Sequence, residues 1–224
     1  MSNTKPLLAI VALLFVLGDR SVYAVDQSFY MGGGGGQSRA KNPATCSDLQ
    51  AIFDPSFGAG SPFSCNSNDT STGWKLFAGY QITPNLAAEV GYVDLGNFKV
   101  SASGSVNLLQ ATASGSDKAN GISLDAVGTL PINQEFGLIG RIGIFAWRLD
   151  ATAIVSAQGA PGGPVSTEDK PTGTSLDFGA GVKYDLNKNF GVRAEYQRFQ
   201  SIGNSNTGKS DVDLFSASVL YRFR

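Results

Sequence analysis

The sequence predicts an all-β fold, an eight-stranded antiparallel up-and-down transmembrane β-barrel. Three observations lead to this prediction. Similar hairpin turns recur along the chain, the flanking segments alternate apolar and polar residues with a period of two, and glycine is abundant (28 of 224 residues) while charged residues are sparse. Abundant glycine disfavours an all-helical fold. The formal net charge of −1, without any basic cluster, gives no sign of a nucleic-acid partner.

The N-terminal segment has the features of a secretory signal peptide over residues 1–24. Lys5 supplies a weak positive region, a short apolar run follows, and Val22 and Ala24 supply the small residues before a cleavage site. The mature chain, residues 25–224, would form the barrel. A transmembrane anchor is the alternative interpretation, but the apolar run is too short to span a bilayer.

Three segments share one turn pattern, in which an aliphatic residue precedes three polar residues and a Leu or Phe opens the next alternating run. The polar turn residues are Thr83-Pro84-Asn85, Asn133-Gln134-Glu135 and Asn187-Lys188-Asn189. Each predicts a short β-hairpin connection. The three hairpins supply six strands, and one further strand at each end of the mature chain completes eight.

The strands follow from strict alternation, as in Phe190, Val192 and Ala194 against Gly191, Arg193 and Glu195. Strands are expected at about 28–36, 74–82, 86–93, 121–132, 136–150, 175–184, 190–197 and 215–223. Between the hairpins lie segments rich in Gly, Ser, Asn, Asp and Thr, which predict long extracellular loops. These segments are about 37–72, 97–119, 150–173 and 201–210.

The polar face of these strands favours a membrane barrel over a soluble one. Glycines interleave with the charges, as a narrow interior filled by side chains requires. The apolar face continues over about nine to eleven residues, the length of a tilted membrane-crossing strand. Aromatic residues gather near the strand ends and predict two interfacial girdles. They are Trp74, Tyr80, Phe136, Trp147, Tyr184, Phe190, Tyr221 and Phe223.

Several charges on the polar face are expected at one depth inside the barrel. Glu89 and Arg193 occupy equivalent positions after their turns, as do Arg141 and Glu195, and Lys183 comes near the same level. Unpaired charges in so confined a space would be unfavourable, so we predict mutual pairing. Two interpretations stay open: a static network that fills the interior, and an electrostatic plug that switches partners and admits ions.

The remaining chemistry-bearing features are few. Cys46 and Cys65 are expected to form a disulfide that closes a surface loop in an oxidising compartment. Two distant thiols without histidine lack the ligand count of a metal site. Histidine is absent from the chain, which excludes His-dependent catalysis. The run Gly32–Gly36 lacks the Lys-Ser/Thr and helix of a phosphate-binding loop, so we expect strand glycines and no cofactor.

Several short stretches, in order and spacing, resemble the transmembrane domain of the OmpA family and related OmpA-like porins. They are Phe29-Tyr-Met-Gly-Gly, Leu76-Phe-Ala-Gly-Tyr-Gln, Glu89-Val-Gly-Tyr, Gly140-Arg-Ile-Gly, Trp147-Arg-Leu-Asp, Val192-Arg-Ala-Glu-Tyr-Gln and Leu220-Tyr-Arg-Phe. The resemblance implies an integral barrel in a Gram-negative outer membrane, periplasmic termini, and assembly by the outer-membrane insertion machinery. It also implies contact with outer-membrane lipid and lipopolysaccharide. The family's lumenal charge partners would correspond to Glu89 and Arg193, with Arg141 and Glu195 close by.

The chain also departs from that pattern. Gly34 stands where the resemblance would place a lumenal lysine, and no peptidoglycan-binding domain is expected after the barrel. We therefore expect a non-enzymatic barrel that contributes to envelope structure or to surface contacts through its loops. The alternative is a narrow, low-conductance porin for ions or small solutes, gated by lumenal salt bridges. The sequence names no external ligand.

Overall fold

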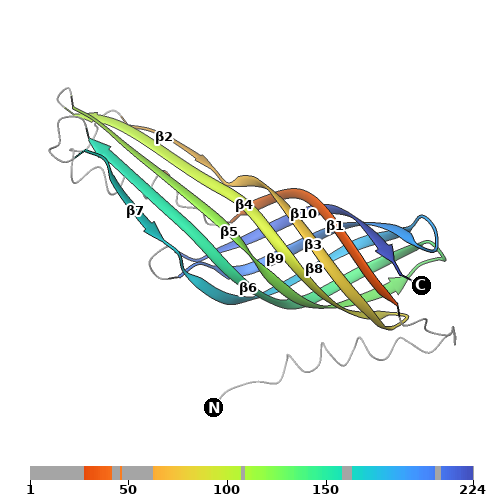
Figure 1. The fold of residues 1–224 in the computed structure, drawn as a ribbon. Helices are drawn as coiled ribbons and strands as arrows, with labels where there is room; N and C mark the ends of the chain where they lie inside the picture. Colours follow the sequence, from red (N-terminus) through yellow and green to blue (C-terminus); the bar gives the residue numbers. More distant parts are fainter. Residues whose placement is uncertain are drawn as a thin grey trace, which may run out of the picture.

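The computed structural model describes residues 28–41, Cys46, and residues 63–106, 109–157, 163–204 and 208–223. The expected signal peptide lies outside them. The described chain forms ten strands (Figure 1): β1 (Phe29–Ala40), β2 (Phe63–Asn68), β3 (Thr70–Thr83), β4 (Leu86–Val106), β5 (Leu109–Pro131), β6 (Phe136–Ala157), β7 (Val165–Asp169), β8 (Thr172–Asp185), β9 (Phe190–Ile202) and β10 (Ser210–Arg222). Within this part of the chain, no helix is long and apolar enough to span a membrane.

Eight of these strands close into one antiparallel ring, in the order β1, β3, β4, β5, β6, β8, β9 and β10. β10 pairs with β1 along a seam that runs from Tyr30 opposite Arg222 to Ala40 opposite Val212. The predicted eight-stranded ring is therefore confirmed. Its closure gives the backbone donors and acceptors of each ring strand a partner in a neighbouring strand, which is the condition for crossing lipid.

The short turns lie together at one end of the barrel (Figure 1). In two of them an asparagine folds back on its own backbone. Asn133 Oδ1 accepts the backbone N–H groups two and three residues further on, at 3.0 and 2.7 Å, and Asn187 Oδ1 does the same at 2.9 and 2.8 Å. In all three turns the first side chain of the triplet accepts the backbone N–H two residues further on, which explains why a polar triplet precedes each returning strand.

The two faces of the ring differ in the sense expected of a membrane barrel. Large apolar side chains point outward and stay exposed, such as Leu76 (56%), Ile142 (60%) and Val219 (53%). Charged and amide side chains such as Glu89 (1%) and Gln197 (0%) are buried inside. A soluble barrel would bury the first set and expose the second.

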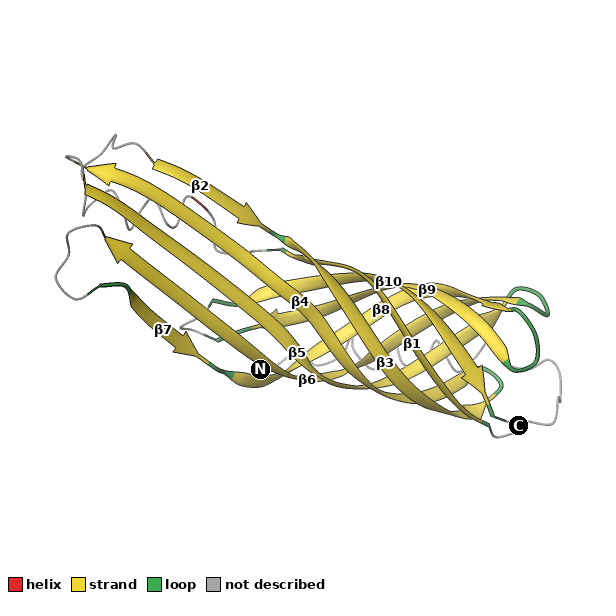
Figure 2. Ribbon diagram, turned by 45° about the horizontal axis from the view of Figure 1, so that its top comes forward, coloured by secondary structure: helices red, strands yellow, loops and turns green. Residues whose placement is uncertain are grey.

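Three ring strands, β4, β5 and β6, continue far beyond the other five, at the end opposite the short turns (Figure 2). β2 pairs with the extension of β4, and β7 pairs with that of β6. We call this the projecting sheet: residues 97–106, 109–118 and 150–157, with β2 and β7.

The prediction of long loops at about 37–72, 97–119 and 150–173 is thus wrong in large part, because each range contains strands. Ala, Ser, Gly and Thr dominate the extensions and give only weak alternation. Their strand conformation follows from the hydrogen-bond register that the ring strands impose. At about 201–210, β9 ends at Ile202, β10 begins at Ser210, and the described residues between them, 203–204 and 208–209, form no strand.

β4 exchanges its partner where the barrel meets the projecting sheet. It pairs with β3 from Leu86 to Asp94, passes through a bulge, and from Lys99 pairs with β2. Gly96 in this bulge has φ +83°, and a Cβ there would lie 2.5 Å from the Thr72 carbonyl oxygen. The backbone conformation and the close approach both require glycine.

Candidate functional site

The interior of the barrel is filled by three layers of buried side chains. The lower apolar layer, nearest the short turns, consists of Tyr30, Phe77, Ala87, Val127, Ile139 and Leu220. The upper apolar layer consists of Ala40, Val93, Leu95, Phe98, Ala119, Phe145, Trp147, Leu149, Phe199, Ile202, Val212 and Leu214. The polar layer contains Lys75, Glu89, Asp125, Arg141, Asp177, Arg193 and Glu195. The order along β6 shows the stacking: Ile139, then Arg141, then Phe145.

Arg141 is the centre of the polar layer. Its Nη1 donates to Glu195 at 2.9 Å, and its Nη2 donates to Asp125 at 2.8 Å and to Glu89 at 3.2 Å. The Arg141 side chain is only 3% exposed, and those of its three carboxylate partners are 0–1% exposed. One guanidinium thus joins strands β4, β5, β6 and β9 through charge-assisted hydrogen bonds.

Glu89 is shared by a second arginine and a phenol. Arg193 Nη1 donates to Glu89 Oε1 at 2.5 Å, and the Tyr30 hydroxyl donates to the same oxygen at 2.6 Å. The guanidinium of Arg193 also lies over the rings of Tyr30 and Phe77, 5.2 and 5.3 Å from their centroids. These cation–π contacts attach the polar layer to the lower apolar layer.

A lysine completes the pairing on the other side of the layer. Lys75 Nζ donates to Glu195 Oε2 at 2.8 Å. In the β1–β3 register Lys75 lies opposite Gly34, the position where the family resemblance would place a lumenal lysine. The neighbouring strand therefore supplies the cation. Gly32–Gly36 lies wholly within β1, as expected of strand glycines.

The structure brings together four of the five predicted lumenal charges, Glu89, Arg141, Arg193 and Glu195. The prediction that Lys183 joins them is wrong. Its amine pairs with Asp185 at 3.5 Å, close to the third short turn, where Arg222 also binds Asp185. Lys183 shares the inward parity of the network and lies opposite Arg193 in the β8–β9 register, but its amine pairs with Asp185, and Arg193 carries the same charge.

Sequence reasoning did not assign three charged members of the polar layer, Lys75, Asp125 and Asp177, to the network. All three lie on strands that run toward a short turn, whereas Glu89, Arg141, Arg193 and Glu195 lie on strands that leave one. Asp125 lies opposite Glu89 in the β4–β5 register, but these two strands belong to different short-turn hairpins, so counting from the turns does not align them. The position of Asp177 depends on the register of β8 against β6, which no local pattern gives.

Most of the aromatic residues expected in girdles lie on the outer surface, and their interfacial role stays a prediction. Near the short turns, the ring centroids of Phe190 and Tyr221 lie 5.1 Å apart. At the other end, Trp74 stacks against Tyr92 at 5.4 Å. The assignment of Trp147 is wrong. It points inward with the parity of Arg141, is 6% exposed, and donates to Ser175 Oγ at 2.8 Å.

The predicted disulfide is confirmed. Cys46 and Cys65 are bonded, with their Cα atoms 5.7 Å apart. Cys65 lies in β2 opposite Ala102 of β4, so the bond is attached to the projecting sheet. No group of three or more His, Cys, Asp or Glu residues able to hold a metal occurs within the described ranges.

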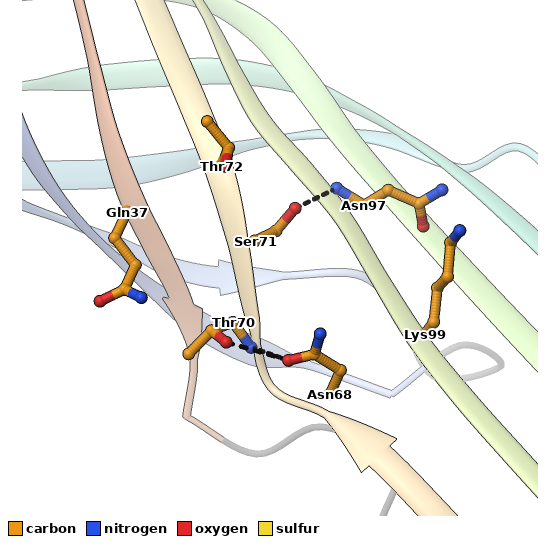
Figure 3. A pocket seen from close by; sticks show the side chains of 7 residues that line it. All are labelled: Gln37, Asn68, Thr70, Ser71, Thr72, Asn97 and Lys99. Atoms are coloured by element: carbon orange, nitrogen blue, oxygen red, sulfur yellow. Dashed lines mark hydrogen bonds between the residues drawn. The ribbon is translucent and has the colours of Figure 1, made fainter.

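A polar pocket of about 440 Å³ lies on the outer wall where β4 exchanges its partner (Figure 3). It is lined by Gln37, Asn68, Thr70, Ser71, Thr72, Asn97 and Lys99. The backbone N–H of Asn97 donates to Ser71 Oγ at 2.8 Å across it. Thr72 lies two residues before Trp74 on the outward face of β3, on the side away from the short turns. The pocket therefore begins where the apolar outer surface ends. Of the lining residues, Lys99 supplies the only cation.

Comparison with known proteins gives the chain its family. The model of the OmpA-like transmembrane domain matches residues 24–224. Outer membrane protein A of Salmonella typhi is 33% identical over 158 residues, which are 70% of this chain and 41% of that protein. The Serratia marcescens protein is 36% identical over 149 residues, 66% of this chain and 38% of that one. The chain thus spans about two fifths of the length of the curated relatives it matches.

Among solved structures, Ail of Yersinia pestis aligns with a TM-score of 0.49 at 17% identity, covering 88% of this chain and 99% of Ail. Neisserial surface protein A aligns with the same TM-score and identity, covering 87% and 97%. The assignment depends on the family match, the closed eight-stranded ring and its apolar outer face. The chain belongs to the OmpA-like transmembrane domain family and is an integral protein of the bacterial outer membrane.

Proposed function

We propose that this protein is a non-enzymatic barrel that contributes to envelope structure and makes surface contacts through the projecting sheet. The observation that carries this proposal is the filled interior. Seven charged side chains of the polar layer lie between two apolar layers, and Arg141 at their centre is almost fully buried. An eight-stranded barrel is only just wide enough for its own side chains. Such an interior favours a structural role over free passage of solutes.

Liposome swelling tests this role. Mature protein refolded into vesicles should leave their permeability to small sugars at the level of empty vesicles. Swelling at a rate well above that level would overturn the structural proposal and favour a pore.

A narrow, gated pore is the second candidate, and the sharing of Glu89 favours it. Arg141 and Arg193 both bind this carboxylate, so either guanidinium can release it while the other keeps it paired. Under this function, Glu89→Ala and Arg193→Ala change the single-channel conductance in planar bilayers. Arg198→Ala is the matched control, because Arg198 pairs with Asp213 outside the polar layer. Unaltered conductance in both lumenal variants would reject the gated pore.

We place the projecting sheet on the extracellular side and the termini in the periplasm. The start of β1 and the end of β10 lie at the short-turn end, which supports this orientation (Figure 1). A peptide tag inserted at Gly163, where an added Cβ would meet nothing within 4 Å, should bind antibody on intact cells. Binding only after the outer membrane is permeabilised would reverse the orientation.

The polar pocket is our proposed contact with lipopolysaccharide headgroups, which lie just beyond the apolar part of the outer leaflet. Hydroxyl and amide groups suit sugar hydroxyls, and Lys99 suits a phosphate. Lys99→Ala should weaken binding to lipopolysaccharide vesicles and leave binding to phospholipid vesicles unchanged. Lys170→Ala, an exposed lysine beside β7, is the control. If Lys99→Ala and Lys170→Ala bind lipopolysaccharide vesicles equally well, the pocket does not bind lipopolysaccharide. Assembly by the outer-membrane insertion machinery is proposed from family membership.

A further inference from the structure

Asp177 differs from the other carboxylates of the polar layer because it has no ion pair with any described residue. It is 0% exposed. Its Oδ1 accepts one hydrogen bond, from Gln197 Nε2 at 2.8 Å, and its Oδ2 has no hydrogen-bond donor among the described residues. An ionised carboxylate buried with a single neutral donor is strongly unfavourable.

The orphaned oxygen of Asp177 has a counterpart on Asp125. Asp125 Oδ2 accepts from Arg141, but its Oδ1 also lacks a donor within the described part of the chain. The two residues flank Gly143 in the strand register, Asp125 on β5 and Asp177 on β8, and both are buried in the interior. A Cβ on Gly143 would lie 2.5 Å from Asp125 Oδ1, so glycine leaves room for the two carboxyl groups to meet.

The charges of the polar layer leave one negative charge uncompensated. Three cations, Lys75, Arg141 and Arg193, face four carboxyl groups, Glu89, Asp125, Asp177 and Glu195. The other two buried aspartates have partners elsewhere. Asp94 pairs with Lys118, and Asp213 pairs with Lys41 and Arg198. One positive charge is therefore needed inside the polar layer. Its expected place is beside Asp177, the carboxyl group of this layer that forms no ion pair with a described residue.

We infer that Asp125 and Asp177 bind one proton between them, as a carboxylic acid hydrogen-bonded to a carboxylate inside the barrel. Two adjacent carboxylates in a low-dielectric interior cannot both ionise without large repulsion. A single proton removes the repulsion, supplies the missing donor and balances the charge of the layer. Because Arg141 holds Asp125 as the anion, Asp177 carries the proton and donates it to Asp125 Oδ1. The site is independent of whether the barrel conducts.

The groups around the pair make a proton a better ligand than a metal ion. Arg141 on β6, Arg193 and Glu195 on β9, Glu89 on β4, Lys75 on β3 and Tyr30 on β1 are the charged and titratable groups that face it. β10 presents the hydroxyls of Ser216 and Ser218. A guanidinium next to Asp125 disfavours a further metal cation, and no metal-binding group of three or more ligands occurs among the described residues.

Infrared spectroscopy of the refolded mature protein tests this site directly. At neutral pH the wild-type spectrum should contain the C=O stretching band of one protonated carboxylic acid. Asp177→Asn should abolish that band, because it removes the acid itself, whereas Asp125→Asn should shift the band, because Asp177 then loses its carboxylate acceptor. Asparagine is isosteric with the neutral acid, so Asp177→Asn should fold, and the shift in electrophoretic mobility on heating checks folding in both variants.

Asp94→Asn is the matched control. Asp94 is also buried but is paired with Lys118, so this variant should keep the band. The inference is overturned if the wild type lacks the band, which would mean that both carboxyl groups are ionised around a cation or water. It is equally overturned if the band survives in Asp177→Asn or if Asp125→Asn leaves it unshifted.

A stability measurement gives an independent readout. Because the folded pair holds its proton more tightly than the unfolded chain, the stability it contributes is lost as the pH rises through the titration of the folded pair. Unfolding in urea should therefore accelerate from neutral to alkaline pH more in the wild type and in Asp94→Asn than in Asp177→Asn. An equal acceleration in all three proteins would contradict the inference.

Discussion

The same three strands build two very different regions, the closed barrel and the projecting sheet. Within the barrel, β6 alternates exposed Ile142 (60%) with buried Arg141 (7%). In the projecting sheet, Ile154 and Val155 are consecutive residues of the same strand, yet both are more than two fifths exposed. The hydrogen-bond ladder continues from one region to the other without a break between β5 and β6. Backbone hydrogen bonding between β5 and β6 therefore maintains the strand conformation in the projecting sheet, where apolar and polar side chains no longer alternate clearly.

The ion pairs of the two regions differ in the same way. The side chains that pair with Arg141 are 0–1% exposed, whereas those of Lys170 and Glu168 beside β7 are 52% and 59% exposed. Exposed pairs contribute about 0–1 kcal/mol, but a buried charge that loses its partner is strongly destabilising. We therefore expect substitutions in the barrel interior to have larger effects than those in the projecting sheet.

The largest effect is expected at the closing seam of the barrel. A Cβ on Gly34 would lie 2.0 Å from the Ala217 carbonyl oxygen of β10. Because a backbone atom cannot rotate away, Gly34→Val should prevent closure, a loss of about 4 kcal/mol or more. The folded fraction in vesicles, measured by electrophoretic mobility before and after heating, reports it. Gly140→Ala is the control, since nothing lies within 4 Å of its added Cβ. Normal folding of Gly34→Val would show that the seam can adjust.

A substantial effect is expected from removing the central cation. Arg141→Met leaves Glu89, Asp125 and Glu195 without this partner, and loss of one member of a buried charge network typically destabilises by about 3–5 kcal/mol. Lys170→Met should lose about 1 kcal/mol or less, because the side chains of Lys170 and its partner Glu168 are 52% and 59% exposed. Urea unfolding of both variants in one lipid system measures the contrast. Equal losses would show that the two regions do not differ in electrostatics as we describe.

The smallest effect is expected from the titration of Asp117 in the projecting sheet. Burial raises the pKa of this carboxyl above its ordinary value. Ionisation therefore weakens the folded hairpin, and stability falls as the pH rises from the ordinary aspartate pKa of about 3.9 through the folded pKa. Asp117→Asn should slow amide exchange in residues 109–118 at neutral pH and have little effect in acid. Faster exchange at neutral pH would mean that the Asp117 carboxylate stabilises the hairpin.

The barrel was predictable because its signals are local. Turn triplets such as Asn187-Lys188-Asn189 fix the hairpins through side chain to backbone bonds, and lipid on one side with a narrow lumen on the other enforces strict alternation. From these, the eight strands and four of the lumenal charges could be placed. Nearness to a strand end predicts an outward position for Trp147, but its parity with Arg141 places it inside the barrel.

The projecting sheet and the Asp125–Asp177 pair were not predictable in this way. In the projecting sheet, Ala102, Ala111 and Ala113 are buried but contrast little with the Ser and Thr residues between them. The acid pair forms across β5, β6 and β8, and its members are 52 positions apart in the chain. The contact between the two side chains depends on how β5, β6 and β8 are aligned, and this alignment is set by the closed ring and not by local sequence.

The exchange of partners by β4 has a consequence for how this protein can evolve. The register of the ring at β3 and β4 is already fixed between Leu86 and Asp94, before the bulge at Gly96. Insertions, deletions or new side chains beyond that point alter β2 and the outer hairpins without moving any residue of the polar layer. Substitutions can therefore accumulate in the projecting sheet while the sequence of the membrane-embedded barrel changes slowly. The same barrel can thus support projecting sheets of different sequence and length.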